Sequence, residues 1–414
     1  MDALDLSTRI DLDRTMDFDT DVLIVGAGPT GLTLALQLAQ FGIRLLVIDA
    51  RAEEANTSRA TIVHARTLEV LEPLGASARL IEIGIRIPRF TIRDSTLVSI
   101  EFSQLRTRYP YALTISQADT ERVLLGLLQE LAVRVVRPRK LISLDQTRAG
   151  AVATLDNGTM LSARYVVGAD GAHSVVRKEA RIELDSGSHD HSFVLADVVL
   201  NGNMPSREVT LYFSPDGPVV VAPLPGGIFR IIAQVASDLS KPDCALMQSL
   251  LDRCGQKVSP GTVERLIWGS SFNVHHHIAN RYHRGHIYLA GDAAHVDSLA
   301  GGQGMNTGIQ DAALLGKLLA IAVQSNDPEL LDEYEKKRRP AAVQIIELAD
   351  KLARLATTPM YRGPLRSAAL FWLARNPEMQ YHLALQLAGL ADLNQAQNRP
   401  VLQSTFRTQH EYGN

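Results

Sequence analysis

The sequence is poor in cysteine and in aromatic residues. Of its 414 residues only two are cysteines, Cys244 and Cys254, whose separation fits neither a metal-ligand pair nor a redox pair. Two reduced thiols are therefore expected, as in a cytoplasmic protein. Aromatic residues make up 5% of the chain, which predicts that any large pocket is lined mainly by aliphatic side chains.

The chain also lacks an excess of charge of one sign and a long apolar run. Its formal net charge is -3, so composition gives no indication of nucleic-acid binding. The acidic N-terminus has neither the basic start nor the apolar core of a secretory signal. The apolar window around residues 314–323 is interrupted by Lys317 and is too short to cross a bilayer. A cytoplasmic protein without a membrane segment is expected.

A complete βαβ unit begins the ordered sequence. Asp21–Val25 is an aliphatic run without polar alternation, as in a strand buried on both faces. It is followed by the turn Gly26-Ala27-Gly28-Pro29-Thr30-Gly31, a helical stretch, and a second buried strand that Asp49 closes. In this pattern Gly26 permits the tight turn, Gly28 lets backbone approach a pyrophosphate, and Gly31 allows close helix–sheet packing. Dinucleotide binding is strongly indicated.

Two further glycine–aspartate turns follow buried strands. The first, Gly168-Ala169-Asp170-Gly171, continues into a turn with serine and arginine. The second, Gly291-Asp292, precedes the Gly-rich stretch Gly301–Asn306, which opens a long helix. An acid in such a turn can hold a polyol hydroxyl, and a helix N-terminus can hold partial negative charge on a ring carbonyl.

The ordered set of these three motifs resembles the flavoprotein monooxygenases of the para-hydroxybenzoate hydroxylase type, over about residues 21–340. It is closest to the branch that hydroxylates phenols, polyketides and antibiotics. The resemblance implies an α/β fold with a Rossmann-like FAD-binding domain, an inserted sheet-rich substrate domain and a helical C-terminal region. The implied boundaries are a polar extension (1–20), a discontinuous FAD domain (21–180 and 281–340, with a strand insertion near 89–115), a substrate domain (181–280) and C-terminal helices (341–414).

The resemblance also implies FAD bound non-covalently in an extended form. Asp49 would bind the adenosine ribose, Asp292 the ribityl chain, and the backbone of Gly304, Met305 and Asn306 the pyrimidine edge of the flavin. The remaining expected cofactor residues are Gly26, Gly28, Thr30, Gly31, Arg59, Gln117, Asp170, Gly291 and Gly302. For Arg59 a surface ion pair is the alternative. NADPH or NADH would reduce the flavin, and O2 would form a flavin C4a-hydroperoxide that oxygenates a small aromatic substrate.

One departure from the family pattern concerns the substrate site. Leu299 occupies the position where the family usually has a proline, so flavin chemistry without net hydroxylation, as in a cyclase, reductase or accessory subunit, is the alternative function. Tyr212 and Arg230, on strands of the inserted region, are candidate substrate contacts, although sheet-packing roles are favoured for both. The sequence identifies no catalytic base. Consecutive strand residues alternate faces, so His275, His276 and His277 cannot converge on one metal.

Two further questions are open at this level. No second Gly-rich βαβ unit is present for a nicotinamide, so the choice between NADH and NADPH is not readable. A dimer face on the helix after Ala341 is possible, but packing against the FAD domain is favoured, and a monomer and a homodimer both fit. A flavin-dependent halogenase would need closely spaced tryptophans, whereas Trp268 and Trp372 are far apart.

Overall fold

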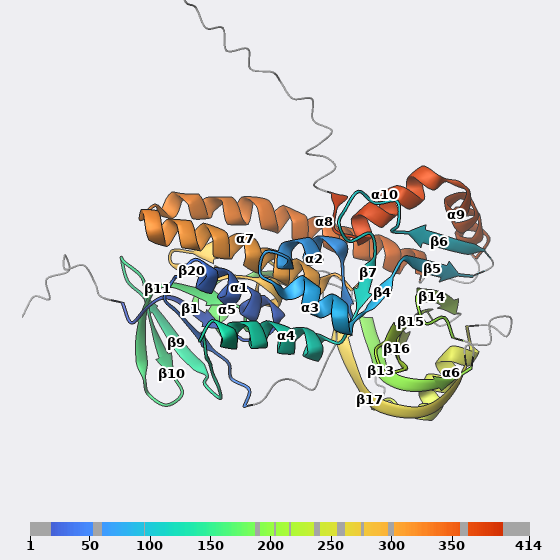
Figure 1. The fold of residues 1–414 in the computed structure, drawn as a ribbon, viewed down its shortest axis with the longest axis horizontal. Helices are drawn as coiled ribbons and strands as arrows, with labels where there is room; N and C mark the ends of the chain where they lie inside the picture. The colour runs from blue at the N-terminus through green and yellow to red at the C-terminus, as the bar shows by residue number, and fades with distance from the viewer. Residues whose placement is uncertain are drawn as a thin grey trace, which may run out of the picture.

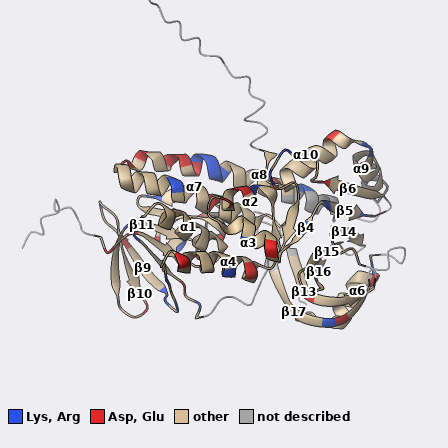
Figure 2. Cartoon of the chain, in the orientation of Figure 1, with Lys and Arg blue, Asp and Glu red and all other residues tan. Residues whose placement is uncertain are grey.

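The computed structural model describes residues 18–52, 60–94, 96–186, 191–202, 204–214, 217–235, 241–254, 261–274, 277–296, 302–356 and 363–391. Two large sheets lie at opposite ends of an elongated molecule, and the long helices α7 (Gly304–Ser325) and α8 (Asp332–Ala356) run along one side (Figure 1). Among the described helices none is long and apolar enough to span a bilayer. In the view of Figure 2, acidic and basic residues are interspersed on the helices.

The first sheet has a parallel centre formed by the expected buried strands. Strand β1 pairs in parallel with β2 and β11, and β11 in turn with β20. An antiparallel extension, β9 and β10, continues from the first half of β11, and Asp156-Asn157-Gly158 makes the predicted turn between β10 and β11. The strands are β19 (His283–Arg284), β20 (Ile287–Leu289), β11 (Met160–Gly168), β1 (Thr20–Val25), β2 (Leu45–Ile48), β8 (Val135–Val136), β9 (Leu141–Gln146) and β10 (Ala151–Leu155).

Strand β8 corrects the sequence-based interpretation. The sequence alone predicts that residues 133–136 form a small antiparallel hairpin set with residues 141–142 and 151–155, yet β8 lies parallel to β2 at the edge of the first sheet. The segment is apolar and short, so its own pattern does not distinguish the two pairings. The helices packed around this sheet are α1 (Pro29–Gln40), α2 (Ala65–Leu71), α3 (Ala76–Ile83), α4 (Gln117–Glu130) and α5 (Val175–Glu179), with α7.

The second sheet combines two separate parts of the chain. Its order is β17-β13-β16-β15-β14-β5-β6, antiparallel except for the parallel pair β14 and β5. Residues 89–101 therefore supply strands outside the first sheet, as their alternation predicted. The bounds are β17 (Thr262–Val274), β13 (His191–Asn201), β16 (Ile228–Val235), β15 (Gly217–Leu224), β14 (Val209–Ser214), β5 (Arg89–Arg93) and β6 (Leu97–Glu101).

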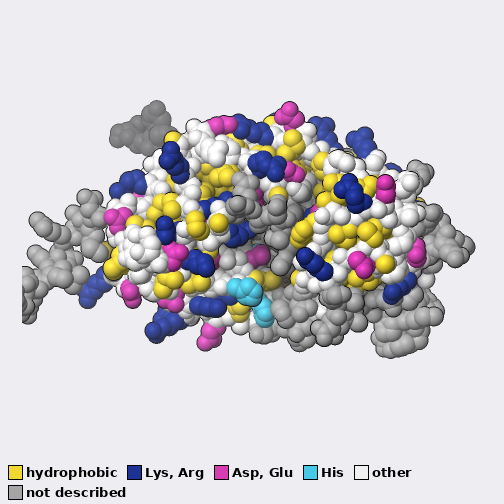
Figure 3. Space-filling view, turned by 90° about the horizontal axis from the view of Figure 1, so that it is seen from below, with side chains coloured by type: hydrophobic (Ala, Val, Ile, Leu, Met, Phe, Trp, Pro, Cys, Tyr) yellow, Lys and Arg dark blue, Asp and Glu magenta, His cyan; other side chains and the backbone are white. Residues whose placement is uncertain are grey.

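Helices cover parts of the second sheet at two places. Helix α6 (Cys244–Asp252) closes a buried cluster on one face, while α9 (Gly363–Arg375) and α10 (Pro377–Leu387) pack against β6. The view of Figure 3 shows apolar side chains interspersed with charged ones over the surface. The remaining short elements are β3 (Ile62–Val63), β4 (Ile85–Ile87), β7 (Ala112–Thr114), β12 (Leu184–Ser186), β18 (His277–Ala279), β21 (His295–Val296), η1 (Gly291–Ala293) and η2 (Pro328–Leu331).

Pro340 does not end a helix, although a proline in a helical pattern predicts a break. It lies inside α8. The flanking arginines fix this part of the helix to the rest of the protein: Arg338 bonds to Asp311 and to the carbonyl of Thr307, and Arg339 to the carbonyl of Ala279. These tertiary contacts outweigh the lost backbone hydrogen bond that a proline imposes.

Candidate active site

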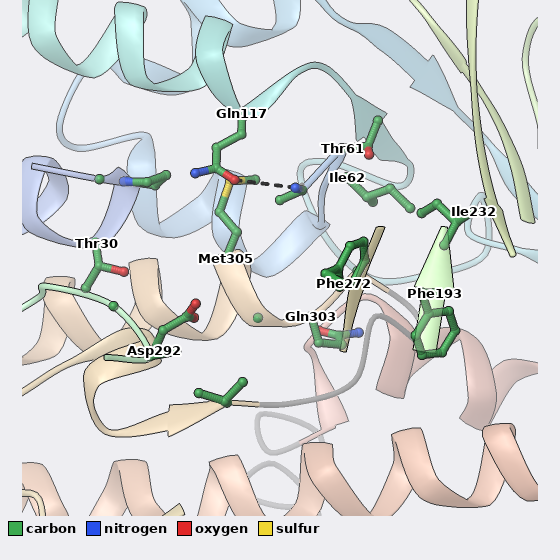
Figure 4. A pocket seen from close by; sticks show the side chains of 18 of the residues that line it. Thr30, Thr61, Ile62, Gln117, Phe193, Ile232, Phe272, Asp292, Gln303 and Met305 are labelled. Carbon is green, nitrogen blue, oxygen red and sulfur yellow. Dashed lines mark hydrogen bonds between the residues drawn. The ribbon is translucent and has the colours of Figure 1, made fainter. Parts of the chain in front are cut away.

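A single cavity of about 910 Å³ connects the two large sheets. One end is formed by the loops at the carboxyl ends of β1, β2 and β11, which we call the nucleotide end. The other is formed by one face of the second sheet together with α10, which we call the second-sheet end. Figure 4 shows Thr30 and Asp292 toward one side, and Phe193, Phe272 and Ile232 toward the other.

The first glycine turn has two packing glycines and one that faces open space. Gly26 adopts φ +107°, and a Cβ there would lie 2.2 Å from the carbonyl oxygen of Ala169. A Cβ on Gly31 would lie 1.9 Å from the carbonyl oxygen of Gly26. A Cβ on Gly28 would meet nothing within 4 Å, although Gly28 lines the cavity. The backbone at Gly28 is thus open to a ligand.

Helix α1 directs its N-terminus to this cavity. Its N-cap is Gly28, with no side-chain cap hydrogen bond, and Thr30 in its first turn lines the cavity. The first N–H groups of a helix have no intrahelical acceptor, so they are available to an anion. Thr30 also packs against the third motif, since a Cβ on Gly291 would lie 2.6 Å from its Oγ1.

Asp49 lies at the end of β2 and lines the cavity. Its carboxylate accepts hydrogen bonds from the N–H of Ala27 at 2.7 Å and from the N–H of Arg51 at 2.8 Å. Burial opposes ionisation, but the side chain and backbone of Arg51 and the N–H of Ala27 hold the pKa of Asp49 below its usual value. Asp49 is therefore an ionised acceptor. Arg51, which sequence reasoning did not single out, also lines the cavity, two residues beyond this acid.

Gln117 lies at the start of α4 and points into the cavity (Figure 4). Its side-chain oxygen accepts from the N–H of Ala60 at 3.4 Å, and its nitrogen donates to Glu121 at 2.9 Å. Burial raises the pKa of Glu121. Arg59, the other residue expected here, lies outside the described residues.

Asp170 follows β11 and lines the cavity while anchoring the next turn. Its carboxylate accepts hydrogen bonds from the Ser174 hydroxyl and from the N–H of Val175 at 2.7 Å. Burial raises the pKa of Asp170 in spite of these bonds. The motif thus binds its own turn and also presents a face to the cavity.

The third motif is held from behind by a buried ionic cluster. Asp292 lines the cavity, and Gly291 before it donates its N–H to Asp311 at 3.1 Å. Asp311 also bonds to His295 at 2.7 Å and to Arg338 at 2.5 Å. Burial opposes ionisation of Asp311, but Arg338 and His295 hold its pKa below the usual value. His295 is a buried, packed residue; the role of Asp311 was not foreseen.

The N-terminus of α7 reaches the cavity between its two ends. Gly302, Gly304 and Met305 line it, and the helix has no side-chain cap hydrogen bond. Asn306 does not line it. Its buried side chain instead bonds to the carbonyls of Ile62 and Gly302 and to the N–H of His64, so it fixes the start of α7.

At the second-sheet end, Tyr212 and Arg230 have the sheet-packing roles that the sequence favoured, rather than the substrate contacts for which they were candidates. Tyr212 faces the cluster under α6, on the opposite face from its neighbour Leu211, which lines the cavity. Arg230 is fully buried and pairs with Asp197 at 2.7 Å while donating to Thr61, so it does not line the cavity either. Both residues are therefore structural. Alternation along the strand turns Tyr212 away from the cavity, and the ion pair with Asp197 holds Arg230 within the protein.

Aromatic residues that the sequence reasoning missed line this end. Phe90, Phe193 and Phe272 contribute there, among mainly aliphatic neighbours as predicted. Leu299 lies outside the described residues, as do His275 and His276. Within the described ranges, no group of three or more His, Cys, Asp or Glu residues could hold a metal ion.

Comparison with known proteins identifies the family. Residues 19–349 match the family model of an FAD binding domain. The chain is 33% identical over 389 residues to an uncharacterised aromatic compound monooxygenase of Bacillus subtilis, covering 89% of this chain and 75% of that one. The chain belongs to the FAD-dependent aromatic hydroxylases.

Solved structures of two relatives share the fold. An anhydrotetracycline hydroxylase from Streptomyces rimosus superposes with a TM-score of 0.77 at 30% identity, covering 90% of this chain and 76% of that one. A Diels–Alderase of pyrroindomycin biosynthesis superposes with a TM-score of 0.74 at 28% identity, covering 89% and 80%. The Rossmann-like FAD domain with a sheet-rich substrate region, as expected from the motifs, is confirmed.

Proposed function

We propose that the protein hydroxylates a small aromatic compound at the second-sheet end of the cavity, with FAD bound at the nucleotide end. The reaction consumes NAD(P)H, a proton and O2; one oxygen atom enters a ring C–H bond and the other leaves as water. The observation that carries this proposal is the continuity of one cavity from Asp49, past Asp292 and Gly304, to the apolar face of the second sheet.

The nucleotide end fits the cofactor. The open space at Gly28 suits a pyrophosphate, and the uncapped N-termini of α1 and α7 suit the phosphates and the ring carbonyl of the pyrimidine edge, respectively. We assign Asp49 to the adenosine ribose and Asp292 to the ribityl chain. Thr30, Gln117, Asp170 and Gly302 complete the wall around the cofactor, and Gly26, Gly31, Gly291 and Asn306 hold its shape.

When bound, FAD supplies the redox and oxygen-activating chemistry, and the protein positions the cofactor and the substrate and shields them from water. The N-terminus of α7 would stabilise negative charge on the reduced ring through its unpaired N–H groups. The apolar second-sheet end would keep bulk water from the reacting centre. Residues 181–280, joined by the strands of 89–101, would form the substrate domain over the FAD domain of 21–180 and 281–340.

The deciding test is Asp292→Ala in the purified protein. The wild-type protein should show a flavin absorbance spectrum and give oxygenated product in amounts that match the NAD(P)H consumed, with products identified by mass. The variant should bind FAD about 10- to 100-fold more weakly, because hydrogen bonds to an ionised group contribute about 1.5–3 kcal/mol. Full flavin loading with unchanged affinity in the variant would contradict the ribityl assignment, and a wild-type protein that takes up no FAD would contradict the function.

A second candidate function is ring closure without net hydroxylation. This alternative is supported by the similarity of the chain to a Diels–Alderase at 28% identity. The stoichiometry of the same experiment separates the two: a product of unchanged mass formed without consumption of NAD(P)H would establish the cyclase.

A further inference from the structure

The charged side chains that line the cavity are confined to its nucleotide end. Among the described residues these are Asp49, Arg51, Arg139, Lys140, Asp170 and Asp292. The second-sheet end, in the strands and in α10 as described, contributes only uncharged side chains. None of the described residues that line this end could therefore neutralise a charged group of a ligand.

The polar side chains at the second-sheet end are few, and several already have partners. Thr61 accepts from Arg230 at 2.9 Å, Thr91 donates to Glu208 at 3.3 Å, and Gln303 donates to the carbonyl of Leu387 at 3.1 Å. Each of these three side chains thus already has a hydrogen-bond partner within the protein. They form the boundary of an apolar surface rather than a binding site for an ion.

The nearest charges beside and behind this surface are also neutralised. Arg230 forms a buried ion pair with Asp197, as described above. Glu208 pairs with Arg93 at 3.0 Å and with Arg89 at 3.1 Å. A ligand charge would therefore have to compete with existing ion pairs.

A pair of aromatic rings contributes to this end. Phe193 and Phe272 are register partners on β13 and β17, with ring centroids 6.2 Å apart and planes inclined by 19°. Ile232, on the strand next to β13, lines the cavity beside them (Figure 4). Rings at this separation leave no room for a ligand between them, so a ligand would contact their outer edges or outer faces.

We infer that the second-sheet end selects a flat, uncharged ring system and rejects an analogue that carries a carboxylate, phosphate or ammonium group. The inference rests on the proposed function and names its substrate class. A charged group buried here would lose its hydration without gaining a charged partner among the described lining residues, which disfavours binding strongly. An uncharged ring gains from burial against Phe193, Phe272 and Ile232.

The test compares two compounds of similar size on the FAD-loaded protein, with binding measured by calorimetry. The probes are 6-hydroxy-2-naphthoate, which is anionic, and its methyl ester, which is neutral. The ester should bind at least about tenfold more tightly than the carboxylate. Equal binding, tighter binding of the carboxylate, or binding of neither at millimolar concentration would each overturn the inference.

Gln234 offers a matched pair of variants. It lies on β16 two residues from Ile232, lines the cavity on the same face and is only partly buried, so a long side chain can be accommodated. Gln234→Arg should improve binding of the carboxylate at least about tenfold relative to the ester. Gln234→Leu, the uncharged control, should keep the wild-type order. An unchanged ratio in a folded, FAD-loaded Gln234→Arg protein would place the ligand elsewhere.

The outcomes for this inference and for the proposed function are separable, because calorimetry reports binding without turnover. Oxygenated product together with a preference for the carboxylate would refute only the inference. A preference for the ester without any oxygenated product would refute only the hydroxylase function.

Discussion

The two ends of the cavity are built in different ways. The nucleotide end is built largely from turns that directly follow the buried strands β1, β2 and β11, so Asp49, Asp170 and the first glycine turn are placed by local chain geometry. The second-sheet end consists of side chains from strands far apart in the sequence, with no charge among those described. The first end is suited to one invariant ligand, whereas the second can change its ligand by substitution of single side chains on a preserved sheet.

The comparison is most severely tested at Asp311, which supports the nucleotide end. Asp311→Asn should lower the free energy of unfolding by about 3–5 kcal/mol, because it leaves Arg338 buried without its counter-ion. It should also weaken FAD binding, since Gly291 and hence Asp292 lose an ionised acceptor. Urea denaturation and flavin titration measure the two effects. Glu333→Gln, at an exposed ion pair with Lys336 and Lys337, is the control and should change stability by less than about 1 kcal/mol.

The pH dependence of this difference has a defined sign. The pKa of Asp311 is lower in the folded protein than in the unfolded chain, so its contribution is present above the ordinary aspartate pKa and is lost as the pH falls through the folded value. The stability gap between wild type and Asp311→Asn should therefore shrink below about pH 4. A gap that widens on acidification would show that Asp311 is not ionised at neutral pH.

The second prediction separates folding from cofactor binding within one turn. Gly31→Ala should destabilise the protein by about 1–3 kcal/mol, because the added Cβ meets the carbonyl oxygen of Gly26. Gly28→Ala should leave the thermal midpoint of the FAD-free protein nearly unchanged, since its Cβ meets no protein atom, and should weaken FAD binding. Midpoints and flavin affinities of both variants are the measurements. Equal loss of stability in the two would contradict the assignment of Gly28 to the ligand.

The same difference explains what could be predicted from the sequence. The nucleotide end could be predicted from the sequence, because each motif contains its strand, turn and acid in one short segment, as at Asp170. The second-sheet end could not be predicted in this way. Both faces of its strands are apolar, so the hydrophobic pattern does not show which face lines the cavity. The structure gives Tyr212 the sheet-packing role that the sequence favoured, but Phe193 was missed. Asp311 was missed because its partners come from two other segments of the chain, residues 291–295 and Arg338.

The smallest expected effects lie at the second-sheet end. Two variants, one on each face of the sheet, decide which face contacts the substrate. Phe272→Leu should raise the KM of an accepted aromatic substrate by a few-fold, equivalent to about 1 kcal/mol of lost aromatic contact, with FAD affinity unchanged. Tyr212→Phe should alter neither KM nor kcat, because Tyr212 faces the cluster under α6. Steady-state kinetics on both variants, with flavin occupancy equalised, measure the contrast. If Tyr212→Phe raised KM and Phe272→Leu did not, the substrate would lie on the other face of the sheet, and the neutral surface inferred above would not be its binding site.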